Sequence, residues 1–369
     1  MAGIYVHIPF CKSKCAYCDF ASYPKELSKT ESYFACLYRE IEGRGRALKG
    51  KTFDTIYIGG GTPSCVPSKY IAGTIRQIRK FFTLTENPEI TIEINPESAQ
   101  KEKIDEYLSV GINRFSIGLQ SGYDEQLKKL GRIHTAKDFL LACNMLKGRN
   151  VSADVLIGLE NQTEEQVGKT LELVIRAGVS HVSVYALTPE VGTPIYSDYL
   201  NGKLLSDDET ASLYDFARKF LAERGFYRYE ISNFAKKGFE SEHNLNYWKR
   251  GEYIGVGVSA SSFIDGRRFT NTYSIDEYCN AIIFNKNPEI SSEIIEGDDA
   301  EFEFVMLGFR TTQGIDEKEF ENLFNENFEK KYADALKKKG RFLEKKDGRI
   351  KIKDEYLYVQ NGILMDFMK

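Results

Sequence analysis

The sequence has 369 residues, of which 42% are hydrophobic and 28% are charged. A chain of this size and composition can bury a large core, so it is neither disordered nor fibrous, and two domains are expected. Lys and Arg total 50 against 54 for Asp and Glu, which gives a formal net charge of -4 and no overall basic field for nucleic acid. Residues 1–10 lack the basic and apolar stretches of a signal peptide, and we therefore expect a cytoplasmic protein.

Segments rich in β-branched and aromatic residues alternate with segments that carry apolar residues at three- and four-residue spacing. The first kind predicts strands over residues 4–8, 55–58, 90–94, 114–119, 153–157 and 181–187. The second kind predicts helices over residues 31–46, 69–82, 101–108, 136–147 and 164–177. This alternation predicts βαβ units and a parallel sheet, in which functional residues gather at the carboxyl ends of the strands.

A hairpin turn is expected at Asp265-Gly266 and a second domain near the carboxyl end. The pattern predicts helices over residues 299–309, 317–324 and 328–339, followed by a small hairpin around Asp347-Gly348. Three helices and a hairpin resemble a winged-helix module. Acidic residues crowd the same region as its lysines, however, so we expect a solvated charged surface and no nucleic-acid binding. The two domains are predicted to span residues 1–285 and 290–369.

Three of the seven cysteines, Cys11, Cys15 and Cys18, lie close together near the amino end. This spacing lets several thiolates converge on one inorganic centre. Structural zinc would need a fourth ligand, which His7 could supply only if the Ile8–Phe10 segment folded back. A [4Fe-4S] cluster usually takes four cysteines, so a loop with three leaves one iron open to an outside molecule.

The stretch Tyr5–Phe20, YVHIPFCKSKCAYCDF, resembles the cluster loop of the radical S-adenosylmethionine (SAM) family. With GGGTP at 59–63, Glu93, SIGLQS at 116–121 and HNLNYW at 243–248, the chain is similar to the HemW-type heme chaperones. That branch is related to the oxygen-independent coproporphyrinogen dehydrogenase HemN. The resemblance implies an α/β protein with an incomplete, TIM-like (β/α)6 barrel and a smaller, winged-helix-like C-terminal helical domain with a β-hairpin.

The resemblance also implies that Cys11, Cys15 and Cys18 hold a [4Fe-4S] cluster whose fourth iron is chelated by SAM. The residues implied to bind SAM are Tyr5, Tyr17, Gly60, Gly61, Thr62, Glu93, Gln120, Arg132 and Asp154. Their chemistry suits the role, because glycines let backbone approach a ligand and a guanidinium pairs with a carboxylate. Without the resemblance, the glycine segment could be no more than a turn. Glu93 and Asp154 could each be a surface carboxylate or a helix cap.

The residue at position 20 separates two functions. HemN-type dehydrogenases carry another cysteine two positions after the third cluster cysteine, whereas Phe20 stands here, as in the HemW type. The motif at 243–248 leads us to expect that His243 binds heme iron and that Tyr247 and Trp248 pack on the porphyrin. Without the resemblance, an isolated histidine beside an asparagine is more often a hydrogen-bonded structural residue. No catalytic residue is assigned.

The expected function is a heme chaperone that binds a [4Fe-4S] cluster, SAM and heme and transfers heme to apo-hemoproteins such as respiratory cytochromes. A reductant protein of the flavodoxin or ferredoxin type is an expected partner, and transient membrane contact is left open. The scaffold is expected to be able to cleave SAM. The alternative is an oxygen-independent coproporphyrinogen III dehydrogenase or another radical SAM tetrapyrrole enzyme. Ser241 and Ser261 stand where family members often have Cys and His, which removes a thiol and an imidazole ligand from these positions.

Overall fold

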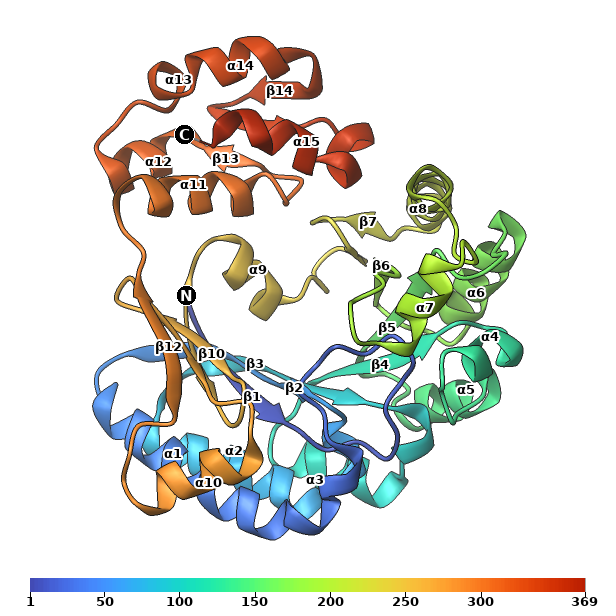
Figure 1. Cartoon of the computed structure of the whole chain (residues 1–369), viewed down its shortest axis with the longest axis vertical. Coiled ribbons are helices and arrows are strands. Elements are labelled where there is room, and N and C mark those ends of the chain that lie inside the picture. Colours follow the sequence, from blue (N-terminus) through green and yellow to red (C-terminus); the bar gives the residue numbers. More distant parts are fainter. Residues whose placement is uncertain (369) are drawn as a thin grey trace.

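The computed structural model describes residues 1–368, so residue 369 of the expected C-terminal domain lies outside it. The described chain has an α/β architecture with a curved sheet in the lower part and a smaller domain above it (Figure 1). The strand order in the large sheet is β12-β11-β10-β9-β1-β2-β3-β4-β5-β6-β8-β7. The sheet is open, since its two outermost strands do not pair with each other.

Six parallel strands form the centre of this sheet. They are β1 (Ala2–Ile8), β2 (Thr52–Gly60), β3 (Thr83–Ile94), β4 (Arg114–Gln120), β5 (Asn150–Ile157) and β6 (His181–Ala186). Each of β1 to β5 pairs in parallel with the strand that follows it along the chain. The helices between them are α1 (Thr30–Ala47), α2 (Ser68–Phe81), α3 (Lys101–Ser109), α4 (Asp124–Lys129), α5 (Ala136–Met145) and α6 (Glu164–Arg176). The predicted βα alternation and partial barrel are thereby confirmed.

Shorter strands extend the sheet at both sides. They are β7 (Tyr227–Arg228), β8 (Asn233–Ala235), β9 (Glu252–Val256), β10 (Ser261–Ile264), β11 (Arg267–Asn271) and β12 (Glu289–Ile294). The accompanying helices are α7 (Pro194–Leu200), α8 (Asp207–Ala222), α9 (Glu242–Trp248) and α10 (Ile275–Ile283). Asp265 and Gly266 both have positive φ and join β10 to β11, so the predicted hairpin is confirmed.

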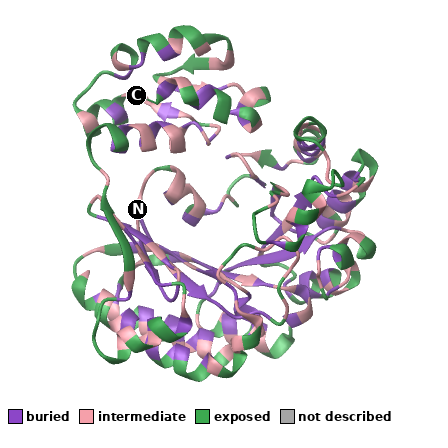
Figure 2. Ribbon diagram, viewed as in Figure 1, coloured by how far each residue is buried: buried purple, intermediate pink, exposed green. Residues whose placement is uncertain are grey.

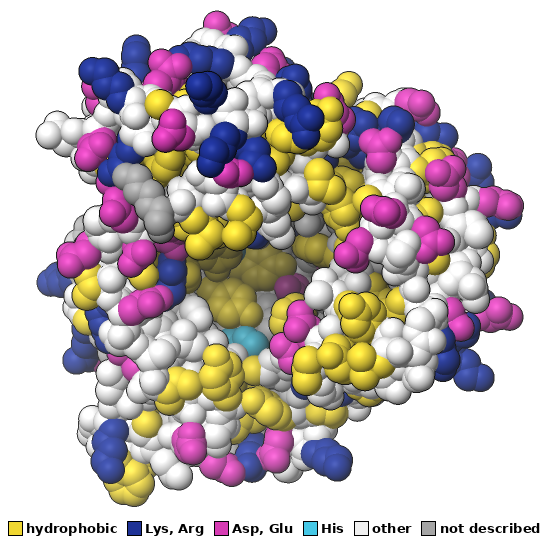
Figure 3. All heavy atoms as spheres, turned by 45° about the horizontal axis from the view of Figure 1, so that its top comes forward, with side chains coloured by type: hydrophobic (Ala, Val, Ile, Leu, Met, Phe, Trp, Pro, Cys, Tyr) yellow, Lys and Arg dark blue, Asp and Glu magenta, His cyan; other side chains and the backbone are white. Residues whose placement is uncertain are grey.

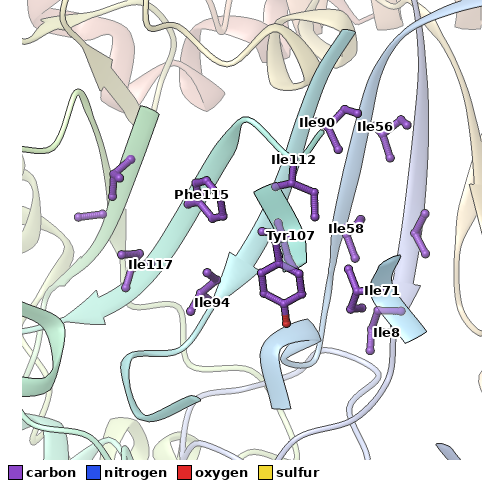
Figure 4. Close-up of a cluster of buried hydrophobic side chains, with 14 of the residues drawn as sticks. Ile8, Ile56, Ile58, Ile71, Ile90, Ile94, Tyr107, Ile112, Phe115 and Ile117 are labelled. Atoms are coloured by element: carbon purple, nitrogen blue, oxygen red, sulfur yellow. The ribbon is translucent and has the colours of Figure 1, made fainter. Parts of the chain in front are cut away.

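The core lies between the parallel strands and the helices that cover their outer face. Figure 2 shows buried residues along the strands and exposed residues on the far sides of the helices. In Figure 4, Ile58 of β2, Ile71 of α2 and Tyr107 of α3 lie among isoleucines from the neighbouring strands. Ile58 and Ile71 have no exposed surface. This apolar layer holds the strands in fixed register, so the side chains at their carboxyl ends are positioned by a rigid support.

The smaller domain has its own helices and sheet. Its elements are α11 (Gly297–Gly308), β13 (Ile315–Asp316), α12 (Glu317–Phe324), α13 (Phe328–Lys331), α14 (Ala333–Lys339), β14 (Leu343–Lys346), β15 (Arg349–Ile352) and α15 (Asn361–Leu364). The single helix predicted over residues 328–339 is wrong, because Tyr332 leaves helical geometry and divides it in two. Buried Phe304, Phe309 and Phe320 belong to a separate hydrophobic cluster.

The boundary between the two parts falls close to the predicted one. Strand β12 pairs with β11, so the large sheet continues to Ile294, four residues past the expected start of the second domain. The division into residues 1–285 and 290–369 stays a prediction. None of the helices within residues 1–368 is long and apolar enough to cross a bilayer.

Candidate cofactor site

A cavity of about 470 Å³ opens at the carboxyl ends of β2 to β6. Its wall includes nearly all the residues expected to bind the cluster and SAM. They are Cys11, Cys15, Cys18, Tyr17, Gly60, Gly61, Thr62, Glu93, Gln120, Arg132 and Asp154. The fold therefore brings together side chains from residue 11 to residue 154. Tyr5 and His243 are the two expected site residues that do not line this cavity.

The three cysteines lie on the loop that follows β1. Two backbone hydrogen bonds hold this loop in place at Ala16, whose N–H donates to the Leu130 carbonyl at 2.9 Å and whose carbonyl accepts from Ile195 N–H at 3.0 Å. Cys11 is buried, and burial raises the pKa of its thiol. Cys15 and Cys18 are half-buried at the cavity wall. The loop thus presents three thiols from a fixed backbone.

Arg132 supplies a cation next to these thiols. Its Nη1 donates to the Cys15 Sγ at 3.4 Å. Among residues 1–368, no group of three or more His, Cys, Asp or Glu side chains could hold a single metal ion. A [4Fe-4S] cluster instead takes one thiolate per iron, so its three ligands stand apart. The donor set fits such a cluster.

The glycine segment at the end of β2 lies against β1 and the start of the cysteine loop. A Cβ on Gly61 would lie 2.6 Å from the Phe10 carbonyl oxygen and 3.0 Å from the Cys11 Sγ. Gly60 has a φ of +114°, and its added Cβ would collide with the His7 ring at 2.7 Å. These positions need glycine so that the backbone can approach the cysteine loop and the cavity.

Asn95 is a site residue that the sequence did not reveal as such. Its Nδ2 donates to the Thr62 Oγ1 at 3.1 Å, and its Oδ1 accepts from the Arg132 Nη2 at 2.9 Å. The same Nη2 also donates to the Gly118 carbonyl at 2.8 Å. One amide therefore couples the glycine segment to the arginine that contacts Cys15, and it fixes the direction of the guanidinium.

Two acidic side chains face the cavity, and each accepts a hydrogen bond from a hydroxyl group. Tyr57 Oη donates to Glu93 Oε1 at 2.9 Å, and burial raises the pKa of Glu93 to about 7. Ser116 Oγ donates to Asp154 Oδ2 at 3.1 Å, and burial also raises the pKa of Asp154. Neither acid is a surface carboxylate or a helix cap. A cationic ligand in this cavity would favour their ionised forms.

Arg114, Ser152 and His181 are further polar residues on the cavity wall that sequence reasoning missed. His181 Nδ1 is 2.7 Å from Ser152 Oγ, and its Nε2 is 2.8 Å from Tyr229 Oη. The signal that could have found them is a polar residue at every second position of an otherwise apolar strand. Such positions face one side of the sheet together.

A second cavity, of about 490 Å³, holds the remaining expected SAM residue, Tyr5. Tyr5 Oη is 3.1 Å from the His7 Nδ1, and both side chains lie on its wall. Asp19 and Phe20 line both cavities, so this part of the cysteine loop forms the partition between them. Phe20, the residue that distinguished the two expected functions, is 68% exposed.

His243 is buried between β2 and its own helix, α9. Its Nδ1 is 2.7 Å from Thr55 Oγ1 and its Nε2 is 2.8 Å from Tyr247 Oη, and only 1% of the residue is exposed. Burial lowers the pKa of His243 to about 3, so the ring is neutral. Iron ligation by either nitrogen would first require one of these hydrogen bonds to break.

The two aromatic residues of the same motif face different spaces. Tyr247 lines the second cavity, whereas Trp248 lines a third, of about 630 Å³, next to α11 and α12. The two serines that depart from the family pattern have structural contacts. Ser241 Oγ caps α9 by accepting from Asn244 N–H, and Ser261 Oγ lies 2.9 Å from Thr270 Oγ1.

Comparison with known proteins agrees with this geometry. Residues 5–174 match the Radical SAM superfamily and residues 295–359 match the HemN C-terminal domain. The chain is 35% identical to the heme chaperone HemW of Buchnera aphidicola, over 88% of this chain and 87% of that protein. It is 33% identical to HemW of Escherichia coli, over 86% of this chain and 85% of that protein.

A solved structure matches the fold along the whole chain. The coproporphyrinogen III oxidase HemN of Escherichia coli, described as a radical SAM enzyme, superposes with a TM-score of 0.87 at 21% identity. The match covers 100% of this chain and 90% of that one. At this identity the likeness concerns the fold alone, while the sequence relatives decide the branch. The chain belongs to the HemW family within the radical SAM superfamily.

Proposed function

We propose that this protein is a heme chaperone that binds a [4Fe-4S] cluster, SAM and heme and passes heme to apo-hemoproteins. The observation that carries the cofactor part is the convergence of Cys11, Cys15 and Cys18 on a cavity that also holds Arg132 and the glycine segment. The names of the sequence relatives support the chaperone part.

In this proposal the cluster is held by the three thiolates and completed by SAM, and when reduced it supplies the electron for cleavage of SAM. Arg132 donates a hydrogen bond to Cys15 and is itself directed by Asn95. Gly60 and Gly61 give the methionine end of SAM access to backbone groups. Glu93, Gln120 and Asp154 hold the remaining part, with the two acids ionised against the positive charge of SAM.

The heme part of the proposal includes His243 as the candidate iron ligand. Phe20 supports a chaperone, since the HemN-type enzyme carries a cysteine at this position. The proposed acceptors are apo-hemoproteins such as respiratory cytochromes, and the proposed electron donor is a flavodoxin- or ferredoxin-type protein. Contact with a membrane during delivery is part of the same proposal, and a vesicle-binding assay with the loaded protein would detect it.

The experiment compares the two candidate activities on one preparation. The protein is purified without oxygen, reconstituted with iron and sulfide, and divided into two portions. One portion is titrated with heme and then mixed with an apo-cytochrome, whose absorbance reports transfer. The other receives coproporphyrinogen III, SAM and dithionite, and the products are measured by chromatography.

Heme binding followed by transfer, with no conversion of coproporphyrinogen, is the expected result. Turnover of coproporphyrinogen without heme binding would instead assign the dehydrogenase activity. A colourless preparation that takes up zinc and does not bind SAM would contradict the cofactor assignment itself.

A further inference from the structure

The second cavity lies between the barrel and the C-terminal domain, beside the cofactor cavity. The stretch from α9 to the loop after β11, loops included, supplies most of its wall, and Glu303 and Leu307 of α11 close it from the other domain. Figure 3 shows that the face of the molecule below the C-terminal domain is hollowed and that hydrophobic side chains line the hollow. The proposed function leaves this cavity without an occupant.

Aromatic rings form the apolar part of its wall. Tyr247 and Tyr253 meet edge to face with ring centroids 4.7 Å apart, and Phe263 follows at 6.4 Å from Tyr253. Tyr273 and Phe20 line the same cavity and are largely exposed. Such walls suit a flat apolar ligand, because aromatic side chains offer a large contact area and retain a polar edge.

Two arginines provide the polar part. Arg250 and Arg268 both lie over the Phe263 ring, at 4.8 Å and 5.2 Å from its centroid. Both also pair with the carboxylate of Glu303: Arg250 Nε is 2.8 Å from Glu303 Oε2, and Arg268 Nη2 contacts Oε1. Arg268 Nη1 is also 3.9 Å from Oε1 of the exposed Glu293. Two adjacent guanidinium groups thus share one acid from the other domain.

Most of this three-residue cluster is out of solvent. The side chains of Arg250 and Glu303 are 17% and 12% exposed, and that of Arg268 is 30% exposed. Asp19 is the other acid on the cavity wall. Arg250 Nη2 also donates to the Ile295 carbonyl at 3.4 Å. Since each guanidinium has five donors, the pair still retains the capacity to donate to further carboxylate oxygens.

We infer that this cavity is the heme site, with the porphyrin against the aromatic wall and its two propionates on Arg250 and Arg268. The inference rests on the proposed function, because heme is the ligand that the function requires. Heme carries two neighbouring carboxylates on a flat apolar ring, which matches two neighbouring guanidiniums beside a row of aromatic rings. In the absence of heme, the Glu303 carboxylate forms ion pairs with both arginines. The heme propionates displace this carboxylate when heme binds. The position next to Asp19 and Phe20 places heme beside the cluster loop.

The test isolates the arginines in a background without the competing acid. Glu303→Gln, which frees both guanidiniums, is compared with the triple variant Arg250→Gln/Arg268→Gln/Glu303→Gln, in which the acid and both cations of the cluster are removed together. Arg267→Gln is the matched control, because Arg267 is the neighbouring arginine, pairs with Glu289 and lies outside the cavity wall. Each reconstituted protein is titrated with iron protoporphyrin IX and with its dimethyl ester.

We expect Glu303→Gln to bind heme more tightly than the wild type and the triple variant to bind it at least about tenfold more weakly than Glu303→Gln. The dimethyl ester should bind all four proteins equally, and iron content and SAM binding should not change. Equal heme affinity in Glu303→Gln and the triple variant would overturn this site while the proposed function stands. A wild type that binds no heme would overturn the proposed function and this site with it. The melting temperature of each variant shows whether its fold is intact. If the triple variant is unfolded, the test relies on Glu303→Gln alone. Failure of Glu303→Gln to bind heme more tightly than the wild type then overturns the site.

Discussion

His243 and Tyr247 are one helical turn apart on α9 and share a hydrogen bond of 2.8 Å between the imidazole Nε2 and the phenol oxygen. The histidine lies behind the tyrosine, which alone of the two lines the second cavity. The other ring nitrogen is bound to Thr55, a residue of β2. The motif at 243–248 therefore presents a tyrosine to the cavity and keeps its histidine in the second layer.

The first prediction concerns this pair. If His243 ligates iron, His243→Ala should shift the Soret band of the heme complex and weaken heme binding, while iron and sulfide contents stay unchanged. Tyr247→Phe keeps the aromatic ring and frees Nε2, so it should not weaken binding. A Soret titration of the three proteins measures both effects. Loss of binding in Tyr247→Phe together with an unchanged spectrum in His243→Ala would assign the ligand to the tyrosine instead.

The second prediction concerns the cluster. Cys15→Ala should abolish the brown chromophore, because one iron loses its thiolate ligand. Cys65→Ala is the control, since Cys65 is a half-buried cysteine near Cys11 that does not line the cofactor cavity. Absorbance near the visible maximum and chemical iron analysis after anaerobic reconstitution report the outcome. Full cluster absorbance in Cys15→Ala would refute the loop assignment.

The third prediction concerns Arg132, which donates to Cys15, Asn95 and Gly118 at once. Arg132→Lys keeps the charge but cannot reproduce a planar fork with several donors. We expect SAM affinity to fall on the order of tenfold, since one charge-assisted contact and its orientation are lost. Equilibrium dialysis with labelled SAM measures the change. Lys129→Arg is a suitable control, because Lys129 is exposed and pairs with Glu160 away from the site. Unchanged SAM binding in Arg132→Lys would contradict a direct role.

The fourth prediction concerns pH. Burial raises the pKa of Glu93 from its ordinary value to about 7, so the folded state holds a proton that the unfolded chain releases at a lower pH. Below the pKa of Glu93 in the unfolded chain, the carboxyl is protonated in both states and does not affect stability. As pH rises towards 7, the unfolded chain ionises Glu93 freely, whereas ionisation in the folded protein would bury a charge. Without SAM, the free energy of unfolding should therefore fall by about 2 to 3 kcal/mol from this residue between pH 5 and pH 8.

Glu93→Gln separates this contribution from those of other buried acids, such as Glu230, whose pKa burial also raises to about 7. In urea unfolding at pH 5 and pH 8, the free energy of unfolding of Glu93→Gln should rise relative to that of the wild type at pH 8. Addition of SAM should reverse the order, because a cationic ligand favours the ionised carboxylate. A pH-independent difference between the two proteins would contradict the proton on Glu93.

Local sequence was enough to predict the large-scale order of the fold. The βα alternation appears in the periodicity of apolar residues, because a strand repeats every second residue and a helix every three or four. The hairpin at Asp265-Gly266 was predictable because such turns need positive φ. The helix over residues 328–339 was not, since the interruption at Tyr332 depends on packing inside the C-terminal domain rather than on local propensity.

The residues of the cofactor site also fall into those that the sequence predicted and those that it missed. The three cysteines and the glycines lie on single loops, and their spacing alone indicates what they can bind. Asn95, Arg114 and His181 were missed because each matters through partners on other strands, which only the register of the sheet brings near. Tyr5 lies on the wall of the second cavity, and its contact with SAM stays a prediction.

The sequence by itself determined which chemistry this chain can support, because thiols, glycines and a cation at fixed spacing depend on a few neighbouring residues. Tertiary structure alone decided which side chains are free to act. His243 is held by Thr55 across 188 positions of sequence, and Glu303 reaches two arginines of another domain. The physical reason is that hydrogen bonds and ion pairs form between groups that are close in space, and folding sets those distances after the local pattern has formed.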